Sequence, residues 1–382
     1  MEGSALVYVF LTIVTASLGL FVRNAEYVPL AIRGGRLPGE RPGCDRQEAR
    51  NRVAVFAVYC LLAGVSACRI AVGNDYWVYT RNFDLISQER HVSSEIGFNL
   101  IVRFFQMLFE KGKVQYVSIF AFFSLITVFL FVKALYDQGS RFAFSLFLLM
   151  TGGYYFNSLN SVRYYLALAL ALFSMKYVLR KEYGKFLLCV LFGMFIHKSI
   201  LLVAPVYLAA HFLAGRKLKR LHFCLGGVFL CSLVFCRDLY RELIFLFYPF
   251  YRDSVFDKGQ LSWTNILKCA CVLLLCAICY RRSLSGDGEH VTNRFYFFLN
   301  LFGLVVYCCG SFIPETSRVG YYMIISQVFL LPNLLGEMKR GWLRGLAHMG
   351  VIAAFGVYFV FLLKGMYATD IRLLPYLNWI FN

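Results

Sequence analysis

Long apolar runs recur from one end of the chain to the other, and each approaches the roughly 20 residues that a helix needs to cross a bilayer. In lipid such runs must be helical, because every backbone polar group needs an internal partner. Only 16% of the 382 residues are charged and 59% are hydrophobic, whereas soluble domains carry about 25% charged residues. We therefore predict an all-α, polytopic integral membrane protein, a single membrane domain over 1–382 with roughly ten to twelve transmembrane helices.

The net charge of +18 could suggest a nucleic-acid partner, but the positions of the basic residues argue against one. Arginines crowd residues 23–52, and further basic clusters lie at 176–185, 216–220, 281–282 and 339–344. Each cluster lies between apolar runs, where the positive-inside rule places cytoplasmic loops. We expect the lipid bilayer and no nucleic acid as a partner, with 23–52 as a basic cytoplasmic loop.

Taking the basic loops as cytoplasmic gives a consistent path through the membrane. Segment 73–113 then forms an outer loop with an amphipathic helix at 96–110, and 237–264 forms a second outer loop. The predicted membrane helices are 4–22, 53–72, 114–132, 142–157, 163–179, 221–236, 265–280, 295–312, 319–336 and 346–364.

Residues 186–213 are apolar except at His197 and Lys198, and basic clusters flank both ends. As one helix they would be about 42 Å long at 1.5 Å per residue, too long for one upright span and too short for two. A short helical hairpin with its apex at His197–Lys198 fits better. Irregular backbone at such depth is tolerated only beside protein or a water-filled cavity, so this apex is a candidate site.

Acidic and aromatic residues gather on the predicted outer face. Asp75 and Tyr76 are followed by Tyr79, and Glu95 begins the amphipathic segment. A solvated loop with aromatic interface anchors would account for them. A surface of carboxylates and tyrosines also suits sugar hydroxyls or proton abstraction.

Three basic positions open predicted helices on that same outer face. Arg163 follows Asn160, Lys198 follows His197, and Arg318 opens a late helix. A cation is unfavourable at a helix N-terminus, where the dipole is positive, although each side chain alone could snorkel to the interface. Together with arginine, helix N-termini bind oxyanions and phosphates. We therefore infer an anionic, lipid-linked ligand at the outer leaflet.

Five short motifs occur in an order that resembles the EpsG family of bacterial exopolysaccharide proteins, among the Wzy-type polysaccharide polymerases. They are Gly-Asn-Asp-Tyr-Trp-Val-Tyr at 73–79, Glu-Ile-Gly-Phe at 95–98, Ser-Val-Arg-Tyr-Tyr-Leu-Ala at 161–167, Phe-Ile-His-Lys-Ser at 195–199 and Arg-Val-Gly-Tyr-Tyr at 318–322. The ordered set covers roughly residues 60–330.

The resemblance implies polymerisation of undecaprenyl-diphosphate-linked oligosaccharide repeat units into capsular, exo- or O-antigen polysaccharide. The protein would lie in the bacterial inner membrane with its active site facing the periplasm. A flippase and a chain-length regulator of the same pathway would be its partners. No cofactor is expected, because the energy lies in the substrate. No cysteine pattern resembles a zinc site, and no Gly-rich phosphate loop is present.

Chemistry of this kind assigns a role to each candidate residue. The nucleophile is a sugar hydroxyl, so His197 is the expected general base or a hydrogen-bond partner of that hydroxyl. Asp75 and Glu95 are the alternative bases. Arg163, Arg318 and Lys198 are expected to bind the diphosphate. The predicted glycan contacts are Tyr76, Tyr79, Asn160 and Tyr322.

Other functions remain open at this stage. A lipid-linked glycan ligase or other membrane glycosyltransferase would share the anion site. A lipid-linked oligosaccharide flippase or transporter would also use broken helices and ionisable residues near the midplane, although no internal repeat is found. An acyltransferase with His197 as base is a further alternative.

The predicted topology can be checked with single cysteines placed in a background free of reactive thiols. Probes at Arg36 and Lys217 should react from the cytoplasm, and probes at Asp75, His197 and Arg318 from outside. Labelling of position 197 from the cytoplasm alone would exclude the hairpin.

Overall fold

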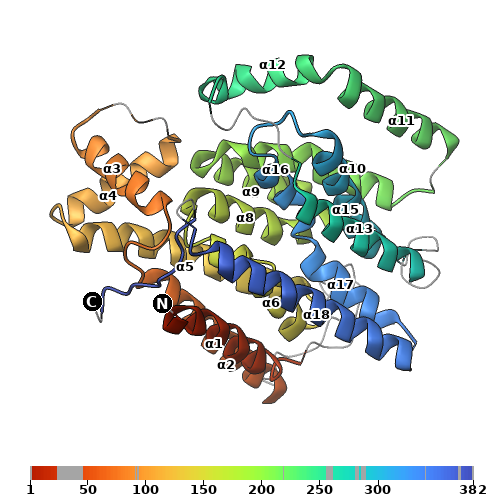
Figure 1. The fold of residues 1–382 in the computed structure, drawn as a ribbon, viewed down its shortest axis with the longest axis horizontal. Helices are drawn as coiled ribbons and strands as arrows, with labels where there is room; N and C mark the ends of the chain where they lie inside the picture. The colour runs from red at the N-terminus through yellow and green to blue at the C-terminus, as the bar shows by residue number, and fades with distance from the viewer. Residues whose placement is uncertain are drawn as a thin grey trace, which may run out of the picture. The chain divides into compact units, whose positions relative to one another are not determined.

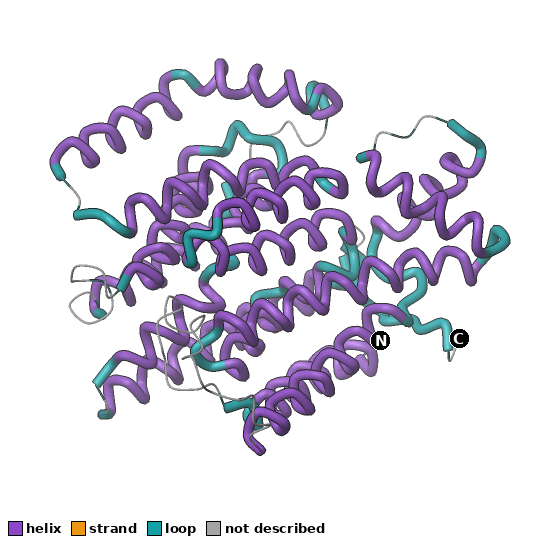
Figure 2. Tube along the Cα trace, turned by 180° about the vertical axis from the view of Figure 1, so that it is seen from behind, coloured by secondary structure: helices purple, strands orange, loops and turns teal. Residues whose placement is uncertain are grey.

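The computed structural model describes residues 2–23, 46–90, 92, 94–217, 219–254, 261–279, 284, 290–339, 341–368 and 371–380. Helices account for most of them, and the β-structure among them is a single bridge between Arg69 and Asn378 (Figure 1 and Figure 2). The predicted all-α fold class is therefore confirmed.

The chain forms two compact units, of which the first comprises Met1–Leu201 and Lys339–Asn382. Its helices are α1 (Glu2–Gly19), α2 (Arg46–Ala67), α3 (Asp75–Ser87), α4 (Ile96–Leu108), α5 (Lys113–Gln138), α6 (Phe142–Thr151), α7 (Tyr154–Asn157), α8 (Val162–Leu179), α9 (Tyr183–Ile196) and α18 (Trp342–Gly365). Within this unit α5 packs on α2 and α8, α8 packs on α9, and α4 contacts α3, α5 and α9.

The second unit comprises Leu202–Met338. Its helices are α10 (Val203–Ala214), α11 (Arg220–Phe235), α12 (Arg237–Phe247), η2 (Pro249–Tyr251), α13 (Trp263–Ile278), α15 (Val291–Cys309), α16 (Thr316–Ile324) and α17 (Gln327–Glu337). Helix α15 is central, because α10, α11, α13, α16 and α17 all contact it.

Six helical segments are long and apolar enough to cross a membrane: α2, α5, α8, α15, the consecutive pair α16–α17, and α18. Shorter apolar helices, including α1, α6, α9, α10 and α13, lie between them in the sequence. The prediction of a multi-pass membrane protein is confirmed. Helices α5 and α8 begin one residue before the predicted 114 and 163, whereas α5 ends at Gln138 instead of 132 and α6 ends at Thr151 instead of 157.

Some helices extend into segments that we predicted as loops. Helix α2 begins at Arg46, within the predicted basic loop 23–52, and residues 24–45, including Arg36, lie outside the described residues. A pair of charges one turn apart, Glu48 and Arg52, forms an ion pair there. Such a pair stabilises a helix without apolar burial, so the helix extends beyond the apolar run. Likewise α3 and α12 are helices inside the predicted outer loops.

The predicted break at His197 is present. Helix α9 ends at Ile196, His197 is extended at φ −156° and ψ 112°, and the 3-10 helix η1 (Lys198–Leu202) follows. Helix α10 then begins at Val203. The predicted break between two short helices is therefore present, and their pairing as a hairpin stays a prediction.

An aromatic cluster fills the first unit between α3, α4 and α5. Phe83 and Phe98 are fully buried and lie 6.1 Å apart between ring centroids, and Phe98 lies 5.5 Å from Phe123. Burying rings of this size contributes several kcal/mol at roughly 25 cal/mol per Å². The cluster therefore fixes α3 and α4, which carry the polar residues considered below.

Buried Arg69 joins three parts of the same unit. Its Nε donates to the carbonyl of Leu159 at 3.0 Å, and its Nη1 donates to Ser124 at 2.6 Å and to the carbonyl of Ser66. The guanidinium lies 5.3 Å from the Phe120 ring centroid. An arginine suits the C-terminal end of α2, where the helix dipole favours a cation.

In the second unit, close contact between α15 and α16 depends on Gly320. A Cβ atom at that position would lie 2.4 Å from the Tyr307 hydroxyl oxygen, and the Tyr307 side chain is fully buried. Overpacking a rigid ring of this kind costs about 1–3 kcal/mol. Gly356 on α18 provides the matched control, because a Cβ there would meet no atom within 4 Å.

We predict that Gly320→Ala lowers the melting temperature of the detergent-solubilised protein, whereas Gly356→Ala does not. The reason is steric, because alanine is otherwise the better helix former. Equal melting temperatures for the two variants would contradict the close packing of α16 on α15.

Candidate functional site

An ion pair between α4 and α8 is the centre of the polar cluster in the first unit. Nη1 of Arg163 donates to Oε2 of Glu95 at 2.7 Å, and the two side chains are 20% and 11% exposed. The guanidinium lies over the Phe98 ring, 4.9 Å from its centroid. Nε of Arg163 is buried and has no hydrogen-bond partner among the described residues. Arg163 thus keeps donor capacity that the protein does not use.

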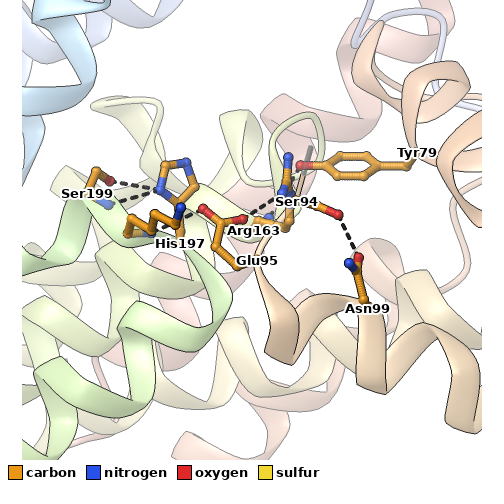
Figure 3. Close-up of polar contacts among 8 residues, drawn as sticks. Tyr79, Ser94, Glu95, Asn99, Arg163, His197 and Ser199 are labelled. Carbon is orange, nitrogen blue, oxygen red and sulfur yellow. Dashed lines mark hydrogen bonds and ion pairs between the residues drawn. The ribbon is translucent and has the colours of Figure 1, made fainter. Parts of the chain in front are cut away.

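The second oxygen of Glu95 reaches the turn after α9 (Figure 3). Oε1 accepts the backbone N–H of Lys198 at 3.1 Å. This N–H opens η1 and has no partner within the helix, so a carboxylate is favourable there. Glu95 therefore connects α4, the first turn of α8 and the turn that carries His197.

Gly97 allows α4 to approach α9 closely enough for these contacts. A Cβ at Gly97 would lie 2.6 Å from the carbonyl oxygen of Phe195. The following residue, Phe98, is the fully buried ring beneath Arg163. Each residue of the Glu-x-Gly-Phe motif thus has a physical role: counterion, close approach and ring platform.

His197 is held by the residue two positions after it. Nδ1 accepts the backbone N–H of Ser199 at 3.3 Å and lies 2.9 Å from the Ser199 hydroxyl oxygen. A backbone N–H can only donate, so Nδ1 is the acceptor, and a neutral His197 then carries its proton on Nε2. The imidazole is half-buried and lies edge-on to Tyr164, with ring centroids 5.7 Å apart.

Asp75 is placed by a tight turn and by the segment before α8. Gly73 has φ +86°, and a Cβ there would lie 2.7 Å from Oδ1 of Asn160, so only glycine fits. The Asp75 backbone N–H donates to Oδ1 of Asn160 at 2.9 Å. Oδ2 of Asp75 accepts the hydroxyl of Ser161, and Oδ1 has no hydrogen-bond partner among the described residues.

The two tyrosines of α3 have different surroundings. Tyr76 is buried and stacks on Phe120 at 4.7 Å between centroids. The Tyr79 hydroxyl oxygen lies 3.5 Å from the backbone nitrogen of Arg163, and its ring is 5.7 Å from the guanidinium carbon. Burial raises the pKa of Tyr79, although the neighbouring Arg163 charge opposes the shift. Tyr79 therefore stays protonated at neutral pH, and Tyr76 is positioned more for packing than for contact with a ligand.

Two predicted site residues, Arg318 and Tyr322, belong to the second unit. Nε of Arg318 lies 3.1 Å from Oε2 of Glu315, and Arg318 is in the first turn of α16. Tyr322 is buried, and its carbonyl accepts the hydroxyl of Tyr207 at 2.6 Å. Their convergence with the cluster around Glu95 stays a prediction.

Residue-by-residue reading of the sequence did not single out Ser161, Ser199 or Phe98. Each hydrogen-bonds or stacks with a predicted site residue. All three lie inside the motifs at 95–98, 161–167 and 195–199, so motif membership was the available signal.

The first unit of this multi-pass membrane protein thus combines apolar helices with a half-buried cation, two carboxylates and a histidine beside helix N-termini. The family model for the EpsG family matches residues 52–378. This range covers most of the chain, which therefore belongs to the EpsG family. Membership makes it a membrane protein of the glycosyltransferase-like kind that acts in polysaccharide biosynthesis. Neither curated proteins nor solved structures gave a significant match.

We predict that Gly97→Ala lowers the amount of polysaccharide made, because its Cβ would push Glu95 away from Arg163 and Lys198. The expected strain is about 1–3 kcal/mol. Gly184→Ala on α9 is the control, since nothing lies within 4 Å of a Cβ there. The measurement is cell-surface polysaccharide at matched protein abundance. Equal output from both variants would mean that the approach of α4 to α9 does not matter.

Proposed function

We propose that the protein polymerises polyprenyl-diphosphate-linked oligosaccharide repeat units at the outer face of the bacterial inner membrane. A hydroxyl of the next lipid-linked unit attacks the anomeric carbon of the growing glycan. The bond from that carbon to undecaprenyl diphosphate breaks, and the undecaprenyl diphosphate is the leaving group. The observation that carries the proposal is that one short segment places both groups. Asn160 and Ser161 hydrogen-bond to Asp75, and Arg163, two residues later, pairs with Glu95.

Arg163 and the helix N-termini beside it form the proposed diphosphate site. Arg163 lies in the first turn of α8, and Lys198 opens η1 with an exposed side chain. The leaving diphosphate gains charge as the glycosidic bond breaks, so a fixed cation stabilises the transition state more than the ground state. The Arg163 side chain is 20% exposed, which leaves part of it accessible to an incoming phosphate oxygen.

Asp75 is the proposed general base. One of its oxygens is held by Ser161, which orients the carboxylate, and the other has no partner among the described residues. An open acceptor on a fixed side chain is what removal of a hydroxyl proton requires. Glu95 lacks this property, because both of its oxygens accept hydrogen bonds from the protein.

His197 is better suited to donate a hydrogen bond than to accept a proton. Its Nδ1 is held by Ser199, so the proton of the neutral ring is on Nε2. This favours the second role expected for His197, that of a hydrogen-bond partner, over that of the base. Because Ser199 occupies Nδ1 of His197, we prefer Asp75 to His197 as the base.

The experiment on the anion site compares Arg163→Lys with Arg103→Lys. Arg103 is an exposed arginine on α4 and serves as the matched control. Lysine keeps the charge but loses the planar fork. We expect normal protein levels and a fall of about a hundred- to thousandfold in polymerisation for Arg163→Lys, by analogy with oxyanion donors, and full-length polymer for Arg103→Lys. Full-length polymer from both variants would refute the arginine site.

The base is tested by Asp75→Asn and His197→Gln. The amide of glutamine can take the place of an Nε2–H donor, whereas asparagine cannot replace a carboxylate base. We expect no chain growth with Asp75→Asn and partial growth with His197→Gln. The reverse result would return the role of base to His197.

A deletion strain separates this proposal from the other functions. Loss of a polymerase leaves single lipid-linked repeat units at the outer face, whereas loss of a flippase leaves them inside. A ligase instead transfers the glycan to another acceptor and leaves chain length unchanged. Gel analysis of surface polysaccharide, with side-specific detection of the lipid-linked units, reads out all three results.

A further inference from the structure

The C-terminal tail, residues 371–379, pairs with the strand-like segment that leads into α3. The backbone N–H of Ile70 donates to the carbonyl of Leu377 at 3.1 Å, and that of Trp379 donates to the carbonyl of Cys68 at 3.0 Å. An antiparallel bridge joins Arg69 and Asn378. Roughly 300 residues therefore separate two backbone segments that hydrogen-bond directly.

The pairing continues to the residues that place Asp75. Gly73 donates its N–H to the carbonyl of Arg372 at 2.8 Å, and Asn74 donates its N–H to the carbonyl of Ile371 at 3.1 Å. These two N–H groups lie directly before α3, which begins at Asp75. On the other side, Asn160 contacts Gly73 and accepts the Asp75 N–H. The turn is thus held between the tail and the segment before α8.

The tail itself is firmly anchored in the first unit. Leu373 and Leu374 are buried at 0% and 2% exposure. The hydroxyl of Tyr8 donates to the carbonyl of Leu373 at 2.9 Å, and the hydroxyl of Tyr376 donates to the carbonyl of Val65 at 2.9 Å. A rigid tail can transmit its position to the turn, whereas a loosely attached one could not.

We propose that the tail is a positioning element of the catalytic site, which fixes the Gly73–Asn74 turn and through it the carboxylate of Asp75. The inference rests on the proposed role of Asp75 as base. It adds to the site a segment outside the five motifs. A displacement of about 1 Å at a reacting group can reduce the rate about a hundredfold, so loss of these two hydrogen bonds affects turnover more than substrate binding.

Arg372 offers a way to test the backbone apart from the side chain. Its guanidinium is exposed, but its φ of +44° is in the left-handed region. Glycine adopts that conformation without strain, whereas proline is locked near φ −65° and cannot. Arg372→Gly and Arg372→Pro therefore lose the same charge. Only the proline variant turns the carbonyl away from Gly73, and it also removes the N–H that Arg372 donates to the carbonyl of Ala368 at 2.8 Å.

The experiment measures kcat and KM for the full-length protein in lipid nanodiscs. The probe is the polyprenyl-diphosphate-linked oligosaccharide fraction extracted from the deletion strain. We expect kcat of Arg372→Pro to fall about a hundredfold with KM unchanged, compared with Arg372→Gly at matched abundance of folded protein. The glycine variant should keep the wild-type kcat.

Three results would overturn the proposal: equal wild-type kcat for both variants, equal loss in both, or a loss in the proline variant that appears in KM alone. If Arg372→Pro does not accumulate, Tyr8→Phe decides, because it removes one anchor of the tail and leaves every motif intact. A lower kcat at unchanged KM supports the tail, and an unchanged kcat refutes it.

Asp75→Asn separates this inference from the function on which it rests. An Asp75→Asn variant with wild-type activity refutes the role of Asp75 itself. An inactive Asp75→Asn together with a fully active Arg372→Pro refutes only the tail. When Asp75→Asn leaves measurable activity, adding Arg372→Pro should cause no further loss, because both changes act through one carboxylate.

Discussion

The carboxylate of Glu95 is the contact on which the rest of the site depends. It pairs with Arg163 on α8 and accepts the N–H that opens η1. A buried charge is costly unless it is paired and its lone pairs are used, and here both oxygens of Glu95 have donors. Because Glu95 binds both Arg163 and the backbone N–H of Lys198, the start of α8 and the turn at His197 cannot shift independently of α4. The glycine at 97 and the ring of Phe98 make that geometry sterically feasible.

Periodicity and charge were sufficient to predict most of the fold. Apolar length predicted the membrane helices, and the flanking basic clusters predicted a break at His197, where α9 ends. These features are local, so a single sequence carries them. The extension of α2 to Arg46 was missed because charged pairs along a helix leave no apolar signal.

The candidate site was predicted in its membership but not in its division of roles. The sequence favoured His197 as the base and kept Asp75 and Glu95 as alternatives. They differ in the structure, because Glu95 is saturated by donors, His197 is engaged through Nδ1, and Asp75 keeps an open oxygen. For Asp75 and Glu95 these contacts join residues 68 to 103 positions apart, which no local pattern encodes, whereas His197 is held by Ser199 two positions away. The tail carries no motif, so its pairing with Gly73 could not be predicted at all.

One turn of chain links the two chemical requirements of the proposed reaction. A general base needs an acceptor oxygen that the protein leaves open, whereas the counterion of a phosphate-binding arginine must be fully satisfied in the absence of substrate. Asn160 and Ser161 hold the first carboxylate, and Arg163 holds the second. Since these residues lie within four positions of one another, the covalent geometry of the chain sets the distance between base and cation. Val162 in this segment packs into the aromatic cluster, and the tail holds the Gly73–Asn74 turn on the other side of Asp75.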